Sequence, residues 1–135
     1  MKTTHRSLTC LAFLLVTIPI GLAVRFLPWH LPWLLWKYLG SMLWAVALYW
    51  LIAALLPRSK PILLAAIAST AAILVELSRL VPEPHIDAFR LTLAGRLLLG
   101  RIFSPWNIAA YLLAITLTAL ADDTTRTTSN PSSTR

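Results

Sequence analysis

The chain has 135 residues, of which 58% are hydrophobic and 13% are charged, and its formal net charge is +7. Soluble domains carry about 25% charged residues, so this composition excludes an ordinary water-facing surface. Blocks without Asp, Glu, Lys or Arg occupy residues 7–24, 38–57, 61–75 and 102–121. Each block approaches the roughly 20 apolar residues that cross a bilayer as a helix. The sequence therefore predicts an all-α, polytopic membrane protein with one four-helix domain over residues 1–121.

The charged residues and the cysteine restrict the partners and cofactors of this domain. Most of the basic residues lie between the apolar blocks, where Lys and Arg flank the ends of membrane helices, so we expect a lipid bilayer and no nucleic acid as partner. Cys10 is the only cysteine and can form no intramolecular disulfide. His5, His30 and His85 are far apart and lie in end or loop segments, so we expect no metal site and no cofactor.

The first predicted span covers residues 8–24 and follows the basic residues Lys2 and Arg6. A cleaved signal peptide is the alternative, because residues 21–23 (Gly-Leu-Ala) resemble a cleavage site. Three further apolar blocks follow, so an uncleaved signal-anchor helix is the simpler interpretation.

Residues 25–37 are rich in tryptophan. Trp29, Trp33 and Trp36 stand at i, i+4 and i+7, which places them on one face of a helix. Tryptophan favours the headgroup layer of a membrane. The pattern predicts a helix that lies along the interface, and an aromatic cage for a cationic ligand is the alternative.

The second and third spans are predicted over residues 39–56 and 62–81, joined by a short basic turn. On a helical projection of the third span, Glu76 lies on the same face as small residues, and Leu63 and Leu74 lie roughly opposite. Small and polar residues face the interior of a membrane bundle, so we expect Glu76 to point inward.

The long segment after the third span combines a break with an amphipathic pattern. A helix is predicted over residues 86–100, with Arg90 and Arg96 on the flanks of its apolar stripe. That pattern is typical of a helix in the membrane interface. The fourth span is predicted over residues 105–121, and residues 122–135 are polar enough to be disordered.

The antiparallel order of four spans brings several polar side chains to one end of the bundle. Glu76 can serve as a structural ion-pair partner of Arg79 or of a loop arginine, because an unpaired charge there costs about 2.5–3.5 kcal/mol. The alternative is a site for a ligand, proton or headgroup. The arginines of the long loop can anchor the chain in the interface or bind an anionic headgroup or polyprenyl phosphate. The candidate site comprises Ser41, Trp44, Glu76, Arg79, Arg90, Arg96, Arg101, Asn107 and Tyr111.

The positive-inside rule leaves the orientation undecided, since six basic residues fall on each side. One side has Lys2, Arg6, Arg58, Lys60, Arg126 and Arg135, and the other has Arg25, Lys37, Arg79, Arg90, Arg96 and Arg101. We predict that both termini are cytoplasmic, because the first helix usually dominates. The opposite orientation stays open.

Several short motifs resemble a known family. They are residues 38–44 (YLGSMLW), Glu76, Arg90, residues 95–100 (GRLLLG), Phe103, Trp106 and Tyr111. Over residues 8–121 they are similar to domain of unknown function 2809, a family of small bacterial integral membrane proteins, and distantly to VanZ-like membrane proteins implicated in glycopeptide-antibiotic resistance. The resemblance implies a multi-pass protein of the bacterial inner membrane and no established activity or cofactor.

The chain departs from this family pattern at Ser41, Arg79 and Asn107. The family usually carries Asp, Gln and Asp at these three positions. Any proton or cation chemistry that the two aspartates perform in relatives would lack those carboxylates here, because this chain has Ser41 and Asn107.

Three functions agree with these patterns. The first is a non-enzymatic membrane protein that binds an anionic envelope lipid or stabilises a membrane-protein partner. The second is an enzyme on a lipid-linked phosphate, with Glu76 as general base and arginines on the phosphate. The third is a small transporter subunit, which would require a homo-oligomer or another partner because four short spans enclose little space.

Overall fold

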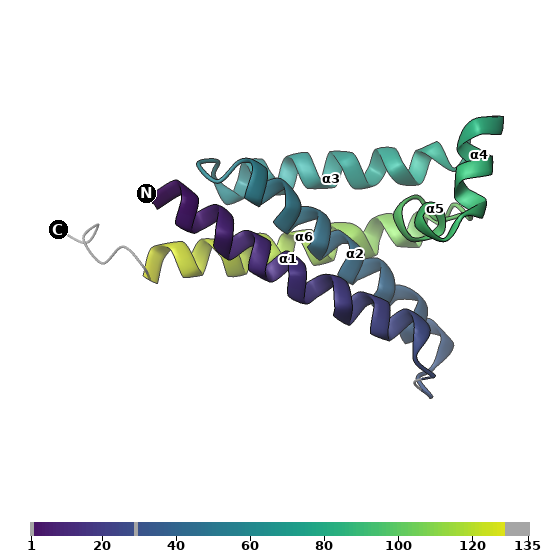
Figure 1. Cartoon of the computed structure of the whole chain (residues 1–135), viewed down its shortest axis with the longest axis horizontal. Coiled ribbons are helices and arrows are strands. Elements are labelled where there is room, and N and C mark those ends of the chain that lie inside the picture. The colour runs from purple at the N-terminus through teal and green to yellow at the C-terminus, as the bar shows by residue number, and fades with distance from the viewer. Residues whose placement is uncertain (1, 29, 129–135) are drawn as a thin grey trace.

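The structure is a computed structural model that describes residues 2–28 and 30–128, and its regular elements within these residues are helices (Figure 1). They are α1 (Lys2–Phe26), α2 (Trp33–Leu55), α3 (Pro61–Ser78), α4 (Pro84–Leu91), α5 (Leu93–Leu98) and α6 (Pro105–Thr128). Four of them, α1, α2, α3 and α6, are long and apolar enough to cross a membrane. The predicted all-α, polytopic architecture is confirmed.

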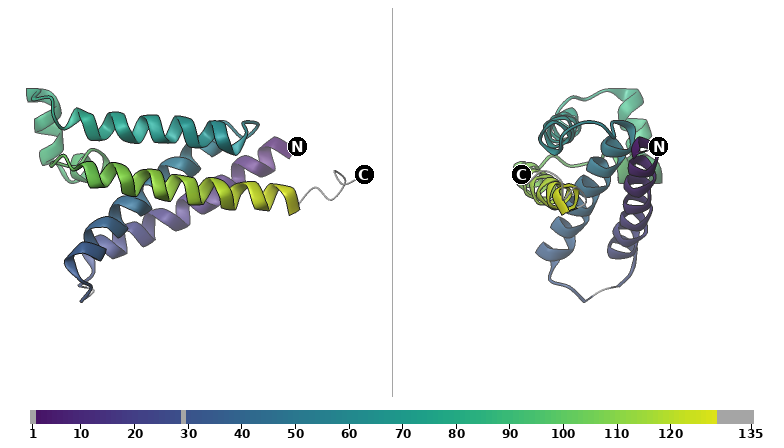
Figure 2. Two further views of the ribbon diagram at one scale, coloured as in Figure 1. Left: turned by 180° about the vertical axis from the view of Figure 1, so that it is seen from behind. Right: turned by 90° about the vertical axis from the view of Figure 1, so that its left-hand side faces the viewer.

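Helix α2 is the centre of the arrangement. It packs against α1 on one side and against α3 and α6 on the other, and α3 packs against α6. Figure 2 shows α2 lying between α1 and the pair formed by α3 and α6. The start of α1 and the end of α6 lie at one end of the bundle, whereas α4 and α5 lie at the opposite end (Figure 1).

Small side chains form much of the contact between these helices. The buried alanines are Ala45, Ala53, Ala68, Ala72 and Ala114. Such residues let helix backbones approach closely in lipid, where apolar burial gives little driving force between helices. Large apolar side chains such as Leu15, Leu55 and Ile62 are exposed on the outside of the bundle, which suits a surface covered by acyl chains.

The long helices differ from the predicted spans mainly at their ends. Helix α1 begins at Lys2 rather than Leu8, and α3 ends at Ser78 rather than Val81. A helix satisfies its own backbone hydrogen bonds, so polar turns can extend it beyond the apolar block. A hydropathy pattern marks the part of a helix that suits lipid and does not mark the helix ends.

The tryptophan-rich segment is not a separate interfacial helix. Helix α1 continues to Phe26, and α2 begins at Trp33, directly after Pro32 at its N-cap. A proline is well tolerated at a helix start and costs stability in a helix interior, although α1 contains Pro19. Trp33 and Trp36 are exposed on the first turn of α2, and Trp29 lies outside the described residues.

The single helix predicted over residues 86–100 is instead two short helices. Thr92 ends α4 and caps α5, and its hydroxyl accepts a hydrogen bond from the Gly95 backbone N–H at 3.0 Å. At Gly95 a Cβ atom would lie 1.9 Å from the Phe89 carbonyl oxygen. The sharp turn between the helices therefore requires glycine at this position.

The predicted disorder of the polar tail is wrong for residues 122–128. Helix α6 continues through them to Thr128, because Asp122 pairs with Arg6 of α1 and Arg126 donates to the Ser59 carbonyl in the turn between α2 and α3. Residues 129–135 lie outside the described part of the chain.

Candidate functional site

Glu76 is the centre of a buried polar cluster, which we call the Glu76 cluster. Its side chain is fully buried near the end of α3, as the helical projection predicts. Oε1 accepts hydrogen bonds from the Ser104 backbone N–H at 2.8 Å and from Asn107 Nδ2 at 3.3 Å. Oε2 accepts one from the Tyr111 hydroxyl at 3.0 Å and pairs with Arg79 Nη1 at 2.6 Å. Burying a carboxylate away from water costs free energy unless hydrogen bonds and an opposite charge offset that cost. The four partners of Glu76 supply both.

Arg79 connects this cluster to the loop that follows α5. Its Nε donates to the Leu99 carbonyl at 2.6 Å, and its Nη1 donates to the Ile102 carbonyl at 3.1 Å. Gly100, between these carbonyls, has a φ of +67°, and a Cβ there would lie 2.5 Å from Arg79 Nη2. The loop therefore needs glycine both for its left-handed backbone and for the close approach of the guanidinium.

Helix α2 contributes Ser41 and Trp44 to the same end of the bundle. The Ser41 hydroxyl lies 3.5 Å from Asn107 Oδ1, at the limit of hydrogen-bonding distance. The rings of Trp44 and Tyr111 have centroids 5.2 Å apart. The structure thus brings Ser41, Trp44, Glu76, Arg79, Asn107 and Tyr111 together from distant segments of the chain.

Arg90 is the predicted site residue that the structure places elsewhere. It is 5% exposed, and its Nη1 pairs with Asp87 at 2.9 Å. Its Nη2 donates to the Ser78 carbonyl at 2.7 Å, so it binds the C-terminal end of α3. Arg90 attaches α4 to α3 and does not reach the Glu76 cluster.

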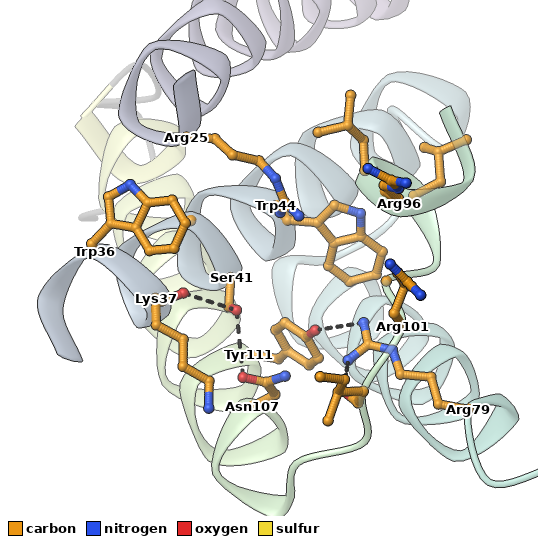
Figure 3. Close-up of a pocket in the computed structure, with 15 residues that line it drawn as sticks. Arg25, Trp36, Lys37, Ser41, Trp44, Arg79, Arg96, Arg101, Asn107 and Tyr111 are labelled. Carbon is orange, nitrogen blue, oxygen red and sulfur yellow. Dashed lines mark hydrogen bonds between the residues drawn. The ribbon is translucent and has the colours of Figure 1, made fainter. Parts of the chain in front are cut away.

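A pocket of about 260 Å³ lies above the Glu76 cluster (Figure 3). Its polar floor contains Ser41, Asn107 and Tyr111. Five basic residues surround it and no carboxylate lines it: the basic residues are Arg25, Lys37, Arg79, Arg96 and Arg101. We call this space the basic pocket, and its charge favours an anionic ligand.

The five cations differ in their freedom to meet a ligand. The Arg79 side chain is 8% exposed and is held by Glu76 and two carbonyls. Arg25, Arg96 and Arg101 are exposed, whereas Lys37 is partly buried and has its Nζ 5.1 Å from the Trp33 ring centroid. Figure 3 shows the arginines reaching the pocket from different elements.

Arg25 and Lys37 are site residues that the sequence reasoning missed. Both fall on the same side of the membrane as the arginine loop, so topology already places them at this end. The missing information was the position of the α1 end and the α2 start, because the sequence predicts a separate interfacial helix between them.

A second buried carboxylate lies at the opposite end of the bundle, and we call its surroundings the Asp122 cluster. Asp122 is fully buried and pairs with Arg6 of α1 and, at 3.1 Å, with Arg126 of α6. The Tyr49 hydroxyl of α2 donates to Asp122 Oδ2 at 2.7 Å. Arg126 also donates to the Ser59 carbonyl in the turn between α2 and α3 at 2.7 Å. This cluster joins α1, α2, α6 and that turn.

The helical spacing of residues along α6 could have predicted that Asp122 is buried, although the polar composition of this segment does not. Tyr111, Ile115, Thr118 and Asp122 are spaced by three or four residues, and all four are buried on α6. The same helical phase continues to Arg126, which is four residues beyond Asp122.

Within residues 2–28 and 30–128, no group of three or more His, Cys, Asp or Glu side chains is arranged to hold a metal ion. Glu76 lies beneath the basic pocket and does not line it. The arrangement is therefore suited to electrostatic binding of an anion by arginine and lysine, with the carboxylate organising the residues below.

Comparison with known proteins identifies the family and nothing more specific. Neither a search of curated proteins nor a search of solved structures gave a significant match. A family model described as a protein of unknown function, DUF2809, matches residues 29–115. The matched region contains the Glu76 cluster and excludes Arg6 and Asp122. Because the match covers well over half of the 135 residues, the chain belongs to the DUF2809 family.

Proposed function

We propose that this protein is a non-enzymatic, multi-pass protein of the bacterial inner membrane that binds an anionic lipid headgroup in the basic pocket. The observation that carries the proposal is the lining of that pocket, which has five cations and no carboxylate. Arginine matches the geometry of phosphate oxygens and can form two parallel hydrogen bonds with them. A ligand with an anionic oxygen group is the natural complement.

The position of the pocket favours a lipid as the source of this anion. It lies at the end of the bundle where α2 begins and α3 ends, so in a bilayer it would be near the headgroup layer. Leu98 and Ile102 line the pocket beside the arginines, and both are exposed. An acyl chain could follow this apolar edge while the headgroup meets the cations.

The burial of Glu76 supports a binding role over an enzymatic one. A general base must come within hydrogen-bond reach of the proton that it removes. Glu76 is fully buried and already accepts hydrogen bonds from Ser104, Asn107 and Tyr111. In this arrangement it has no contact with the space that a substrate would occupy.

Native mass spectrometry tests the proposal through co-purified lipid. Wild type is compared with Arg96→Ala/Arg101→Ala, and Arg58→Ala/Lys60→Ala removes the same charge from the turn between α2 and α3 as a matched control. We expect wild type and the control to retain the same anionic lipid, and the pocket variant to lose it by about tenfold or more, the scale of one charge-assisted hydrogen bond. Circular dichroism verifies that all three fold. Equal retention by all three would overturn the proposal.

The orientation follows the same proposal and has its own test. With both termini in the cytoplasm, as the first helix favours, the basic pocket would face the opposite side of the membrane. A membrane-impermeant thiol reagent is applied to intact cells carrying single cysteines at exposed Arg58 or Arg101 in a Cys10→Ser background. Labelling at position 101 and protection at 58 is the expected result, and the reverse pattern would contradict it.

A further inference from the structure

The ion pairs near the basic pocket show which of its cations have a carboxylate partner and which do not. Glu76 compensates Arg79 at 2.6 Å. The other ion pairs between described residues involve Arg6, Arg90 and Arg126 with Asp122 or Asp87. Four cations at the pocket therefore have no carboxylate partner in the described part of the chain: Arg25, Lys37, Arg96 and Arg101.

These four cations come from two parts of the chain that meet at the pocket. Arg25 lies in the last turn of α1 and Lys37 in the first turns of α2, whereas Arg96 and Arg101 belong to α5 and the loop after it. Figure 3 shows Lys37 on the Asn107 side and Arg96 far from it. A compact ligand that meets cations from both parts needs acceptor oxygens in several directions.

A phosphodiester headgroup meets this requirement poorly. It has two unesterified oxygens and one negative charge, which would leave most of the four cations uncompensated. A terminal phosphate has three such oxygens and, at pH 7, a charge of about −1.5 to −2 because its second pKa is about 6. A terminal diphosphate has still more oxygens and charge.

The size of the pocket agrees with a bare terminal group. Pockets for drug-sized ligands span about 300–1,000 Å³, and this one has about 260 Å³. A phosphate or diphosphate at the end of an acyl or isoprenyl chain would place only the charged group inside. Trp36 and Trp44 also line the space and occupy part of its wall beside the cations.

Resting on the proposed function, we propose that the basic pocket selects a terminal phosphate or diphosphate group over a phosphodiester. The apolar edge formed by Leu98 and Ile102 favours a lipid that carries this group. A water-soluble phosphate ester shares the same chemistry, so the test must separate the two sources.

The experiment compares two lipids with identical acyl chains on delipidated protein in non-ionic detergent. Phosphatidic acid presents a terminal phosphate and phosphatidylglycerol a phosphodiester. At pH 8 we expect native mass spectrometry to show phosphatidic acid bound about tenfold more tightly, the factor that corresponds to one additional charge-assisted hydrogen bond. Arg96→Ala/Arg101→Ala should lose this preference, and Arg58→Ala/Lys60→Ala should keep it.

A change of pH tests charge with the lipid held constant. Below its second pKa of about 6 the phosphate of phosphatidic acid carries one negative charge, whereas phosphatidylglycerol keeps its single charge. The preference for phosphatidic acid should therefore shrink towards equality at pH 5. A preference that is unchanged at pH 5 would show that charge does not determine it.

The outcomes separate this inference from the proposed function. If both lipids bind equally and both are lost in the pocket variant, the pocket binds anionic lipid but the selection for a terminal phosphate is refuted. If neither lipid depends on the pocket arginines, the proposed function fails as well. If inorganic pyrophosphate binds as tightly as phosphatidic acid and displaces it, the charge class stands and the lipid source is refuted.

Discussion

Glu76 and Asp122 are both fully buried carboxylates in membrane-spanning helices, at opposite ends of the bundle, and each has an arginine and a tyrosine beside it. Their surroundings differ. Asp122 is enclosed by two arginines from two helices, and its partners close one end of the bundle. Glu76 has one arginine, and above that pair lies a pocket with further cations. An intramembrane ionisable residue is a functional candidate by default. The comparison of the two clusters shows that unpaired charge beside such a residue indicates a binding site better than the buried residue itself does.

The largest expected effect comes from Glu76→Gln. The Arg79 side chain is only 8% exposed, so removal of its carboxylate partner leaves a buried, uncompensated charge. Breaking a buried pair in this way costs about 3–5 kcal/mol. We expect the free energy of unfolding, measured by SDS titration in mixed micelles, to fall by that amount. Arg79→Met/Glu76→Met, which removes both charges, should recover a substantial part of it, and no recovery would contradict the ion-pair interpretation.

Asp122→Asn should cost less, about 2–3 kcal/mol, although it leaves two arginines without their carboxylate. The Arg6 and Arg126 side chains are 19% and 26% exposed, so both can turn partly towards water. The same titration measures the loss. Binding of anionic lipid should stay at the wild-type level, since the Asp122 cluster lies at the other end of the bundle. A loss of lipid binding in a folded Asp122→Asn protein would contradict the conclusion that lipid binding depends only on the end of the bundle that contains Glu76.

The two ends were also unequally predictable from sequence. Four apolar blocks predicted four spans because a bilayer requires long apolar helices, and antiparallel order brought Ser41, Glu76 and Asn107 to one end. The Asp122 cluster was missed because its polar neighbours indicate disorder unless Arg6, 116 residues away, is known to pair with it. The different positions of Arg90 and Arg96 were also not predictable, because they depend on the break between α4 and α5 at Thr92. Arg90 binds the end of α3, whereas Arg96 lies at the basic pocket.

A matched pair of tyrosine variants sharpens the comparison. Tyr49→Phe and Tyr111→Phe each remove one hydroxyl that donates to a buried carboxylate, at 2.7 Å and 3.0 Å respectively. A hydrogen bond to a charged group contributes about 1.5–3 kcal/mol, and we expect losses near the lower bound because other donors remain at each carboxylate. Only Tyr111 lines the basic pocket, so only Tyr111→Phe should alter lipid retention in native mass spectra. Equal effects of both variants on lipid would assign the change to stability alone.

The most specific expected effect on binding comes from Gly100→Ala. A left-handed backbone costs a residue with a Cβ about 1–2 kcal/mol, and the new Cβ would lie 2.5 Å from Arg79 Nη2. Arg79 would have to move from the Leu99 and Ile102 carbonyls, and the loop that carries Arg101 would move with it. We expect the free energy of unfolding to fall by at least about 1–2 kcal/mol, together with reduced binding of anionic lipid.

Gly21→Ala is the matched control for this variant. A Cβ added at Gly21 would make only an ordinary van der Waals contact, 3.7 Å from Leu43 Cβ, and Gly21 does not line the pocket, so lipid binding should stay at the wild-type level. If Gly100→Ala retains lipid as well as Gly21→Ala does, the loop held by Arg79 is not part of the binding site. The arginines of that loop would then be anchors in the membrane interface, because their charge would have no ligand to select.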